Sequence, residues 1–300
     1  LETMTWARRP NPKIAYYESK VTAPSQVFKP GDIIQVEVKT PSKTGTDYEF
    51  TLFQEPVAQG SLLSIEAESG HVKAMIGGRD FRDSQFNRAY QSRRQPGSAF
   101  KPVIYAAALD KGYTPATVIM DSPLVYEDAA RDFIWKPQNY AQTFYGPTLF
   151  RQALVHSRNV VTIKILQDIS IPYAIEYARK LGITSDISED LSIALGSSGV
   201  SLLELVNAYA VFSNLGYFIE PVFITKIFDR HGNLLETSQL ARKKVIDMST
   251  AYIMTHLLES VVTSGTGQRV KALNRPVAGK TGTTNNLYDA WFLGYTPRYT

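Results

Sequence analysis

The 300-residue chain contains no cysteine and only four histidines. The missing thiols exclude disulfides, thiolate zinc sites and a cysteine nucleophile. No two histidines stand at the spacing of metal ligands, so we expect neither a metal site nor another cofactor. The chain also lacks an uninterrupted apolar run of the ~18 residues that a membrane-spanning helix needs.

Charge is sparse and mixed. The 32 Lys and Arg residues exceed the 28 Asp and Glu residues by a net charge of +4, and no block of basic residues occurs. This pattern does not indicate nucleic-acid binding, although anionic cell-surface polymers or a membrane surface stay possible as partners. The chain opens on Leu1 with no signal-peptide pattern. We therefore expect a piece of a longer protein.

What is present is the composition of a packed globular protein, with 44% hydrophobic residues, 17 Tyr and 14 Phe. The length suits one large domain and a small one. Residues 1–55 are rich in proline, and short strands over 33–38 and 48–53 predict a small β module. Lys29-Pro30-Gly31-Asp32 predicts a turn. We interpret Lys43-Thr44-Gly45-Thr46 as a polar loop between the two strands.

Residues 56–300 predict a larger domain with strands at both ends and helices between them. Such a pattern indicates one sheet, built from distant parts of the chain and covered by helices. The expected strands are 62–67, 72–76, 222–228, 277–284 and 290–295. Helical patterns cover 98–109, 146–167, 171–181, 201–215 and 249–262.

The first chemical feature is Ser98 with Lys101, at the start of the helix predicted after Pro96-Gly97. Residues three apart share one helix face, so the hydroxyl and the amine can meet. A hydroxyl at a helix N-terminus also faces the positive end of the helix dipole. The pair therefore fits a nucleophile with an amine base, although a capping serine beside a solvated lysine gives the same pattern.

Two further motifs follow. Ser157 and Asn159 are two apart, so they converge on one site only at a loop or a helix start. In the strand containing Lys280-Thr281-Gly282-Thr283, alternation puts both threonines on one side and Lys280 on the other. Gly282 permits a close approach to the backbone, and a free N–H at an edge strand could form half of an oxyanion hole.

Ser-x-x-Lys, Ser-x-Asn and Lys-Thr-Gly in this order are the signature of class A β-lactamases and penicillin-binding proteins. The chain resembles the transpeptidase domain of the class A, bifunctional penicillin-binding proteins over residues 55–300. Its middle motif reads Ser-Arg-Asn instead of Ser-Asp-Asn. The resembling segments are RQPGSAFKPVIYAAALDKGYTPAT, YGPTLFRQALVHSRNVVTIKIL, LSIALGSSGVSLLELVNAYAVFSNLGY and GKTGTTNNLYDAWFLGYTP.

The resemblance implies an α/β (α+β) fold of the penicillin-binding, β-lactamase-like type. An antiparallel sheet is covered by helices and carries a helical subdomain. Residues 1–55 would belong to a small OB-like β insertion, and 56–300 would form a serine D,D-transpeptidase domain. That family's sheet has a further strand and a helix after the segment ending at Thr300, so we expect a C-terminal truncation.

The resemblance also implies catalytic roles. Ser98 is the acylated nucleophile and Lys101 its proton acceptor. Ser157 relays a proton toward the leaving amine, with Lys280 beside it. Lys101 needs a lowered pKa to act as a base, because a free lysine with a pKa near ~10.4 is almost wholly protonated at pH 7. Burial and the like charge of Lys280 would both lower that pKa.

Substrate binding is implied for the remaining motif residues. Asn159 binds the substrate's amide, and Thr281 and Thr283, on either side of Gly282, hold its terminal carboxylate. The backbone N–H groups of Ser98 and Thr283 form the oxyanion hole. The substrate is the D-Ala-D-Ala end of a peptidoglycan stem peptide, the acceptor is the amine of a second stem, and β-lactams are covalent inhibitors.

The implied location is the periplasmic face of the bacterial inner membrane, with a glycosyltransferase domain and a membrane anchor in the full-length protein. Two alternatives stay open: a β-lactamase or D,D-carboxypeptidase of the same fold, and a non-enzymatic β-lactam sensor. A hydrolase would need a carboxylate that activates water, for which Glu127 and Glu189 are candidates. We interpret Trp135 as a core or loop anchor, with a wall of the peptide site as the alternative.

Overall fold

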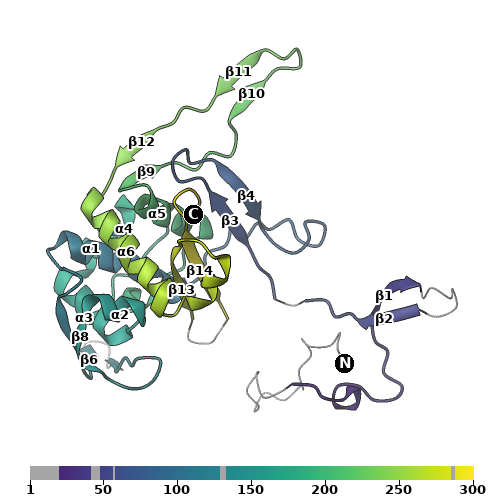
Figure 1. Cartoon of the computed structure of the whole chain (residues 1–300), viewed down its shortest axis with the longest axis horizontal. Coiled ribbons are helices and arrows are strands. Elements are labelled where there is room, and N and C mark those ends of the chain that lie inside the picture. The colour runs from purple at the N-terminus through teal and green to yellow at the C-terminus, as the bar shows by residue number, and fades with distance from the viewer. Residues whose placement is uncertain (1–19, 42–47, 57, 129–132, 285–287) are drawn as a thin grey trace. The chain divides into compact units, whose positions relative to one another are not determined.

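The protein is described by a computed structural model that covers residues 20–41, 48–56, 58–128, 133–284 and 288–300. The chain divides into two compact units, residues 1–59 and 60–300 (Figure 1). Each unit is described by itself below.

Within its described residues, the first unit carries one antiparallel strand pair. Strand β1 (Val36–Pro41) pairs with β2 (Tyr48–Leu52), with an irregularity between Val38 and Pro41. A short 3₁₀ turn, η2 (Pro24–Gln26), precedes them. The predicted turn is confirmed: the Asp32 N–H donates to the Lys29 carbonyl over 3.1 Å. The Lys43–Thr46 motif lies outside the described residues.

The second unit is organised around helix α1 (Lys101–Asp110), which follows the 3₁₀ turn η3 (Gly97–Phe100). Residues 101–109 of α1 are all buried, which agrees with the apolar run in the sequence. The helices around it are α2 (Phe150–Val155), α3 (Asn159–Ile169), α4 (Ile171–Lys180), α5 (Leu202–Ser213) and α6 (Met248–Ser264). Two more 3₁₀ turns are η4 (Leu191–Leu195) and η5 (Gln268–Leu273).

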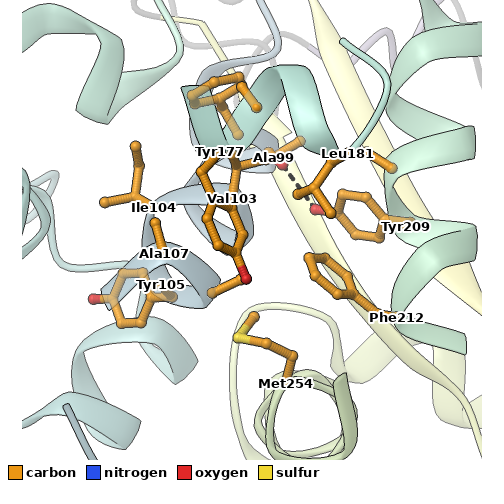
Figure 2. Close-up of a cluster of buried hydrophobic side chains, with 14 of the residues drawn as sticks. Ala99, Val103, Ile104, Tyr105, Ala107, Tyr177, Leu181, Tyr209, Phe212 and Met254 are labelled. Carbon is orange, nitrogen blue, oxygen red and sulfur yellow. Dashed lines mark hydrogen bonds between the residues drawn. The ribbon is translucent and has the colours of Figure 1, made fainter. Parts of the chain in front are cut away.

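Side chains from these helices meet α1 in one core. Figure 2 shows Val103, Ile104 and Tyr105 of α1 among side chains from the α4, α5 and α6 regions. α1 contacts α3, α4 and α6, so it is enclosed along its length. Enclosure on every side suits a helix with apolar residues all round. None of the helices in the described part of the chain is long and apolar enough to cross a membrane.

The strands of the second unit form antiparallel pairs. β3 (Leu62–Ile65) pairs with β4 (Val72–Ile76), and β13 (Ala278–Thr283) with β14 (Ala290–Tyr295). The others are β5 (Val118–Asp121) with β8 (Gly146–Leu149), β6 (Tyr126–Asp128) with β7 (Phe133–Trp135), β9 (Tyr217–Ile219) with β12 (Arg242–Lys244), and β10 (Lys226–Phe228) with β11 (Leu234–Thr237). The β10–β11 hairpin projects from the helical body in Figure 1.

The two ends of the second unit lie side by side. The N–H of Ile65 donates to the Thr300 carbonyl and the N–H of Thr300 to the Ile65 carbonyl, each over 2.9 Å. The Ala67 N–H donates to the Arg298 carbonyl over 3.0 Å. Residues 298–300 therefore lie antiparallel beside β3 through an isolated bridge at Tyr299. Within the described residues the strands form separate two-stranded sheets, so the single sheet that the sequence predicts is not observed.

Three predictions about elements need correction. The helical pattern over 146–167 is interrupted: residues 146–149 form β8, and a turn at 156–158 separates α2 from α3. The strand expected at 222–228 is present only as β10, from residue 226. Ser98 does not begin the α-helix but lies in the 3₁₀ turn before it.

Candidate active site

Ser98 lies in a tightly packed turn between Gly97 and helix α1. Gly97 has a φ of +56°, and a Cβ there would overlap the Thr283 carbonyl oxygen. Its N–H donates to the Gly196 carbonyl over 3.2 Å. The Tyr209 hydroxyl donates to the Ala99 carbonyl over 2.7 Å, the dashed line in Figure 2. Contacts on both sides fix the turn and leave Ser98 partly exposed.

Lys101 is the first residue of α1 and is fully buried. Its Nζ donates to the Ser157 carbonyl over 2.7 Å and to Asn159 Oδ1 over 2.8 Å, and lies 3.3 Å from Ser157 Oγ. The structure therefore brings the Ser-x-x-Lys and Ser-x-Asn motifs into direct contact.

Ser157 and Asn159 converge because the chain turns between two helices. Ser157 has a φ of +56°, a left-handed conformation that is costly for a serine. α3 begins at Asn159, so the pair occupies a helix start. Arg158 points elsewhere, with its guanidinium 3.3 Å from the centre of the Tyr145 ring. This geometry is the one that the two-residue spacing required.

The Lys280–Thr283 motif lies on β13, which packs against the Ser98 turn. A Cβ on Gly282 would overlap the Pro96 carbonyl oxygen. Lys280 is fully buried, Thr281 is half-buried and Thr283 is exposed, as the predicted alternation requires. Lys280 Nζ donates to the Thr281 carbonyl over 2.9 Å, and the Thr281 hydroxyl lies 2.8 Å from that of Thr266.

The pKa values of Lys101 and Lys280 are both lowered. Burial holds the pKa of Lys101 well below its usual range, and the positive charges of Lys280 and Arg158 lower it further. Burial alone lowers the pKa of Lys280 to about 7. A lysine with a depressed pKa can accept the proton of a nearby hydroxyl, and the hydroxyl that Lys101 Nζ contacts directly is that of Ser157, 3.3 Å away.

The sequence did not reveal several residues that hold the site. Tyr209 supports the Ser98 turn from α5, and Trp291 of β14 donates its indole N–H to the Gln95 carbonyl over 3.0 Å. Asn139 accepts the backbone N–H of Asn159 over 2.9 Å. Asn139 lies four residues after Trp135, and no pattern in the sequence marks it as a site residue.

Three residues that the sequence suggested for the peptide site or for water activation lie outside the hydrogen-bonded cluster around Lys101. Trp135 is half-buried, packs against the core and lines a surface hollow with Tyr126. Glu127 and Glu189 are exposed, and neither makes a hydrogen bond within the site as described. Within the residues that the structure describes, no group of three or more His, Cys, Asp or Glu could hold a metal ion.

Comparison with known proteins gives the family. The model of the family described as "Penicillin binding protein transpeptidase domain" matches residues 60–300. Penicillin-binding protein 1A of Pseudomonas aeruginosa is 37% identical, over 92% of this chain and 39% of that protein. Penicillin-binding protein 1A of Neisseria meningitidis is 43% identical, over 83% and 32%. The chain thus spans 39% and 32% of the length of these two curated relatives.

Solved structures show the same fold. The crystal structure of penicillin-binding protein 1A from Haemophilus influenzae matches with a TM-score of 0.81 and 30% identity, over 89% of this chain and 45% of that one. The PonA1 protein of Mycobacterium tuberculosis, solved in complex with penicillin V, matches with a TM-score of 0.70 at 24% identity, over 81% of this chain and 69% of that one. With the family model matched over residues 60–300, the chain belongs to the penicillin-binding protein transpeptidase domain family.

Proposed function

We propose that the chain cross-links peptidoglycan by serine acyl transfer and is a target of β-lactams. The observation that carries this proposal is Lys101, a buried amine with a lowered pKa, three residues after Ser98 and held by Ser157 and Asn159. A base of this kind makes a serine hydroxyl nucleophilic at neutral pH.

In the proposed acylation, Ser98 Oγ attacks the carbonyl carbon of the penultimate D-alanine while Lys101 Nζ accepts the hydroxyl proton. The resulting oxyanion accepts hydrogen bonds from the N–H groups of Ser98 and Thr283. The C–N bond then breaks, and the leaving D-alanine amine receives a proton through Ser157, with Lys280 beside it. An ester on Ser98 is left.

In the second half, the amine of another stem peptide attacks this ester and gives up one proton, which returns to Ser98 Oγ as the ester bond breaks. Asn159 binds the substrate's amide, and Thr281 and Thr283 bind its terminal carboxylate, which Lys280 also favours. Gly282 keeps β13 close to the Ser98 turn. β-Lactams enter the first half-reaction and form a slowly hydrolysed ester.

The partners and the location belong to the same proposal. The donor and acceptor are stem peptides on the periplasmic face of the inner membrane. In the full-length protein a glycosyltransferase domain and a membrane anchor accompany this chain, and residues 1–55 are part of a small β insertion. Neither Glu127 nor Glu189 makes a described hydrogen bond to Lys101, Ser157 or Asn159, and this supports transfer to an amine over hydrolysis.

Mass spectrometry after exposure to benzylpenicillin tests the proposal. We expect one stoichiometric adduct on the peptide that contains Ser98, no adduct in Ser98→Ala, and none in folded Lys101→Ala. Ser238→Ala, which alters an exposed serine, is the control. A normal adduct in Lys101→Ala would contradict the base assignment.

Turnover separates the proposed reaction from the alternatives. A chromogenic β-lactam should give a single burst of colour equivalent to the amount of protein, whereas steady turnover of the β-lactam would indicate a lactamase. Stem peptides with an added acceptor amine should yield a cross-linked product. Release of D-alanine without transfer would indicate a carboxypeptidase, and acylation without any peptide reaction would indicate a sensor.

A further inference from the structure

Asn139 lies beneath the site and is 3% exposed. Its Nδ2 donates to the Asp121 carboxylate, with distances of 3.0 Å and 2.9 Å to the two oxygens, and to the Thr143 carbonyl over 2.9 Å. Its Oδ1 accepts the N–H of Asn159 over 2.9 Å and that of Val160 over 3.4 Å. The amide thus uses its whole capacity of two donors and two acceptors.

These partners permit one orientation of the amide. Asp121 and Thr143 offer acceptors, whereas Asn159 and Val160 offer N–H donors. Flipping Asn139 would place oxygen against a carboxylate and NH₂ against N–H groups. The network therefore fixes both the position and the direction of the side chain.

Helix α3 needs this contact at its first turn. Its N-cap residue, Arg158, makes no side-chain cap, so the first N–H groups depend on a partner from another segment. The preceding Ser157 has a φ of +56°, which local preferences disfavour. Asn139 supplies the missing acceptor and holds a turn that the local sequence would not hold unaided.

The same segment holds the side chain of Asn159. The Gln138 carbonyl accepts from Asn159 Nδ2 over 3.0 Å, while Asn159 Oδ1 accepts from Lys101 Nζ over 2.8 Å. Residues 138–139 therefore fix both the backbone and the amide of Asn159. Its oxygen faces the amine as a result.

Asp121, at the end of β5, is 1% exposed and makes no ion pair with a described residue. Lys164 lies nearby, but its Nζ donates to the Met120 carbonyl and the Ser122 hydroxyl. A buried carboxylate whose observed side-chain partner is a neutral amide is costly for stability. Its position behind Asn139 strengthens the amide as an acceptor for α3.

We propose that Asn139, oriented by Asp121, is a positioning residue for acyl transfer: it sets the Ser157–Asn159 turn against Lys101. The inference rests on the proposed function. Asn139 touches no reacting atom and acts through Asn159 and Ser157.

A reciprocal exchange tests the pair. In Asn139→Asp two carboxylates face each other, so we expect the second-order rate of acylation by a fluorescent penicillin to fall about 10- to 100-fold. The double variant Asn139→Asp/Asp121→Asn restores a donor opposite an acceptor at position 121 and keeps an acceptor for α3, while the Thr143 carbonyl still loses its donor. We expect it to recover part of the lost rate.

Two readouts separate positioning from a merely structural role. The amplitude of labelling at saturation counts the folded, competent molecules, and the rate constant reports their geometry. Positioning predicts a lower rate constant at full amplitude, with Tyr140→Ala, which alters an exposed side chain next to Asn139, as the matched neighbouring control. A lower amplitude with an unchanged rate constant, or no recovery in a folded double variant, would overturn the proposal.

NMR titration of ¹³C-labelled Lys101 gives a readout that needs no acylation. Charges that face Lys101 come from Lys280 on β13 and Arg158 at the α2–α3 turn, and neither is altered. Asn139→Asp would add a negative charge that raises the Lys101 pKa by itself, so the uncharged variant Asn139→Ala is used for this readout. Without Asn159 Oδ1 in place, the ammonium form loses an acceptor, and the Lys101 titration should move to lower pH in Asn139→Ala. If the pH at which Lys101 titrates does not change, the positioning role is refuted. If penicillin does not acylate the wild-type chain, the proposed function is refuted instead.

Discussion

At the scale of residues, the site is defined by two buried amines that the fold keeps close together. Lys101 and Lys280 are both fully buried, and the charge of Lys280 lowers the pKa of Lys101. Burying a lysine destabilises its charged form, which helps a general base and weakens the fold. The same burial therefore links catalysis to a pH-dependent stability.

Lys280→Met tests this link. The pKa of Lys280 is about 7 in the folded chain, against ~10.4 in an unfolded one. Between these values the unfolded state binds more protons, so wild-type stability rises with pH. Below pH 7 Lys280 is protonated in both states, and burying its charge then lowers the free energy of unfolding by its full amount, on the order of 4 kcal/mol. We expect the methionine variant to be more stable at pH 7, with a difference that shrinks toward pH 10 in urea unfolding.

The control for this measurement is Lys243→Met, which removes an exposed lysine from β12. A Lys280→Met variant that is less stable than wild type at pH 7 would contradict the prediction. So would a difference in the free energy of unfolding that stays constant across the pH range.

The motif residues could be singled out because three short motifs in this order resemble a known family, and the structure agrees with the local geometry of their spacing. Their catalytic roles stay a prediction. Ser98 and Lys101 share one turn, and alternation along β13 separates Lys280 from Thr281. Asn139 could not be found in this way, because its partners lie 18 and 20 positions away and depend on tertiary packing. A buried amide has no sequence pattern of its own.

At the scale of elements, the site depends on how closely β13 approaches η3. Gly282 meets the Pro96 carbonyl oxygen on one side, and its hypothetical Cβ would lie 2.9 Å from Ala99 Cβ. Small residues on both elements let two backbones touch. The distance between the Ser98 turn and the Lys280 strand is therefore set by the absence of a side chain.

We expect Gly282→Ala to push β13 away from the turn and to lower the acylation rate by at least about 100-fold, because displacements near 1 Å suffice for such a loss. Gly60→Ala is the matched control, since nothing lies within 4 Å of its Cβ position. Penicillin labelling kinetics measure both variants. Equal rates would show that the close packing is not needed.

Elements were predicted well where one strong pattern extended over a whole element, as in α1 and the β13–β14 pair. The apolar pattern over 146–167 resumes after the polar residues 156–158 and so hid a break, which lies at Ser157, where φ is +56° and contacts with Asn139 and Lys101 hold the turn. At 222–228 the apolar residues are largely exposed, so a hydrophobic run there did not mark a buried strand.

At the scale of the molecule, the described buried core draws only on residues from 63 onward, and thus only on the second unit. That unit also closes on itself, since residues 65–67 pair with 298–300. Leu63 and Ile65 of β3 are 8% and 1% exposed, so the first strand is part of the core. Residues 60–300 therefore contain the described core and the hydrogen-bonded residues around Lys101.

Two truncations test this independence. Residues 60–300 alone should unfold cooperatively and acylate within about 2-fold of the full chain, because core and site stay complete. Removing residues 1–77 also deletes β3 and β4, and losing Leu63 and Ile65 alone should cost about 3–6 kcal/mol. A chain starting at residue 78 should therefore fail to give a sharp thermal transition. If 60–300 were unfolded while the full chain labels normally, the first unit would be part of the fold after all.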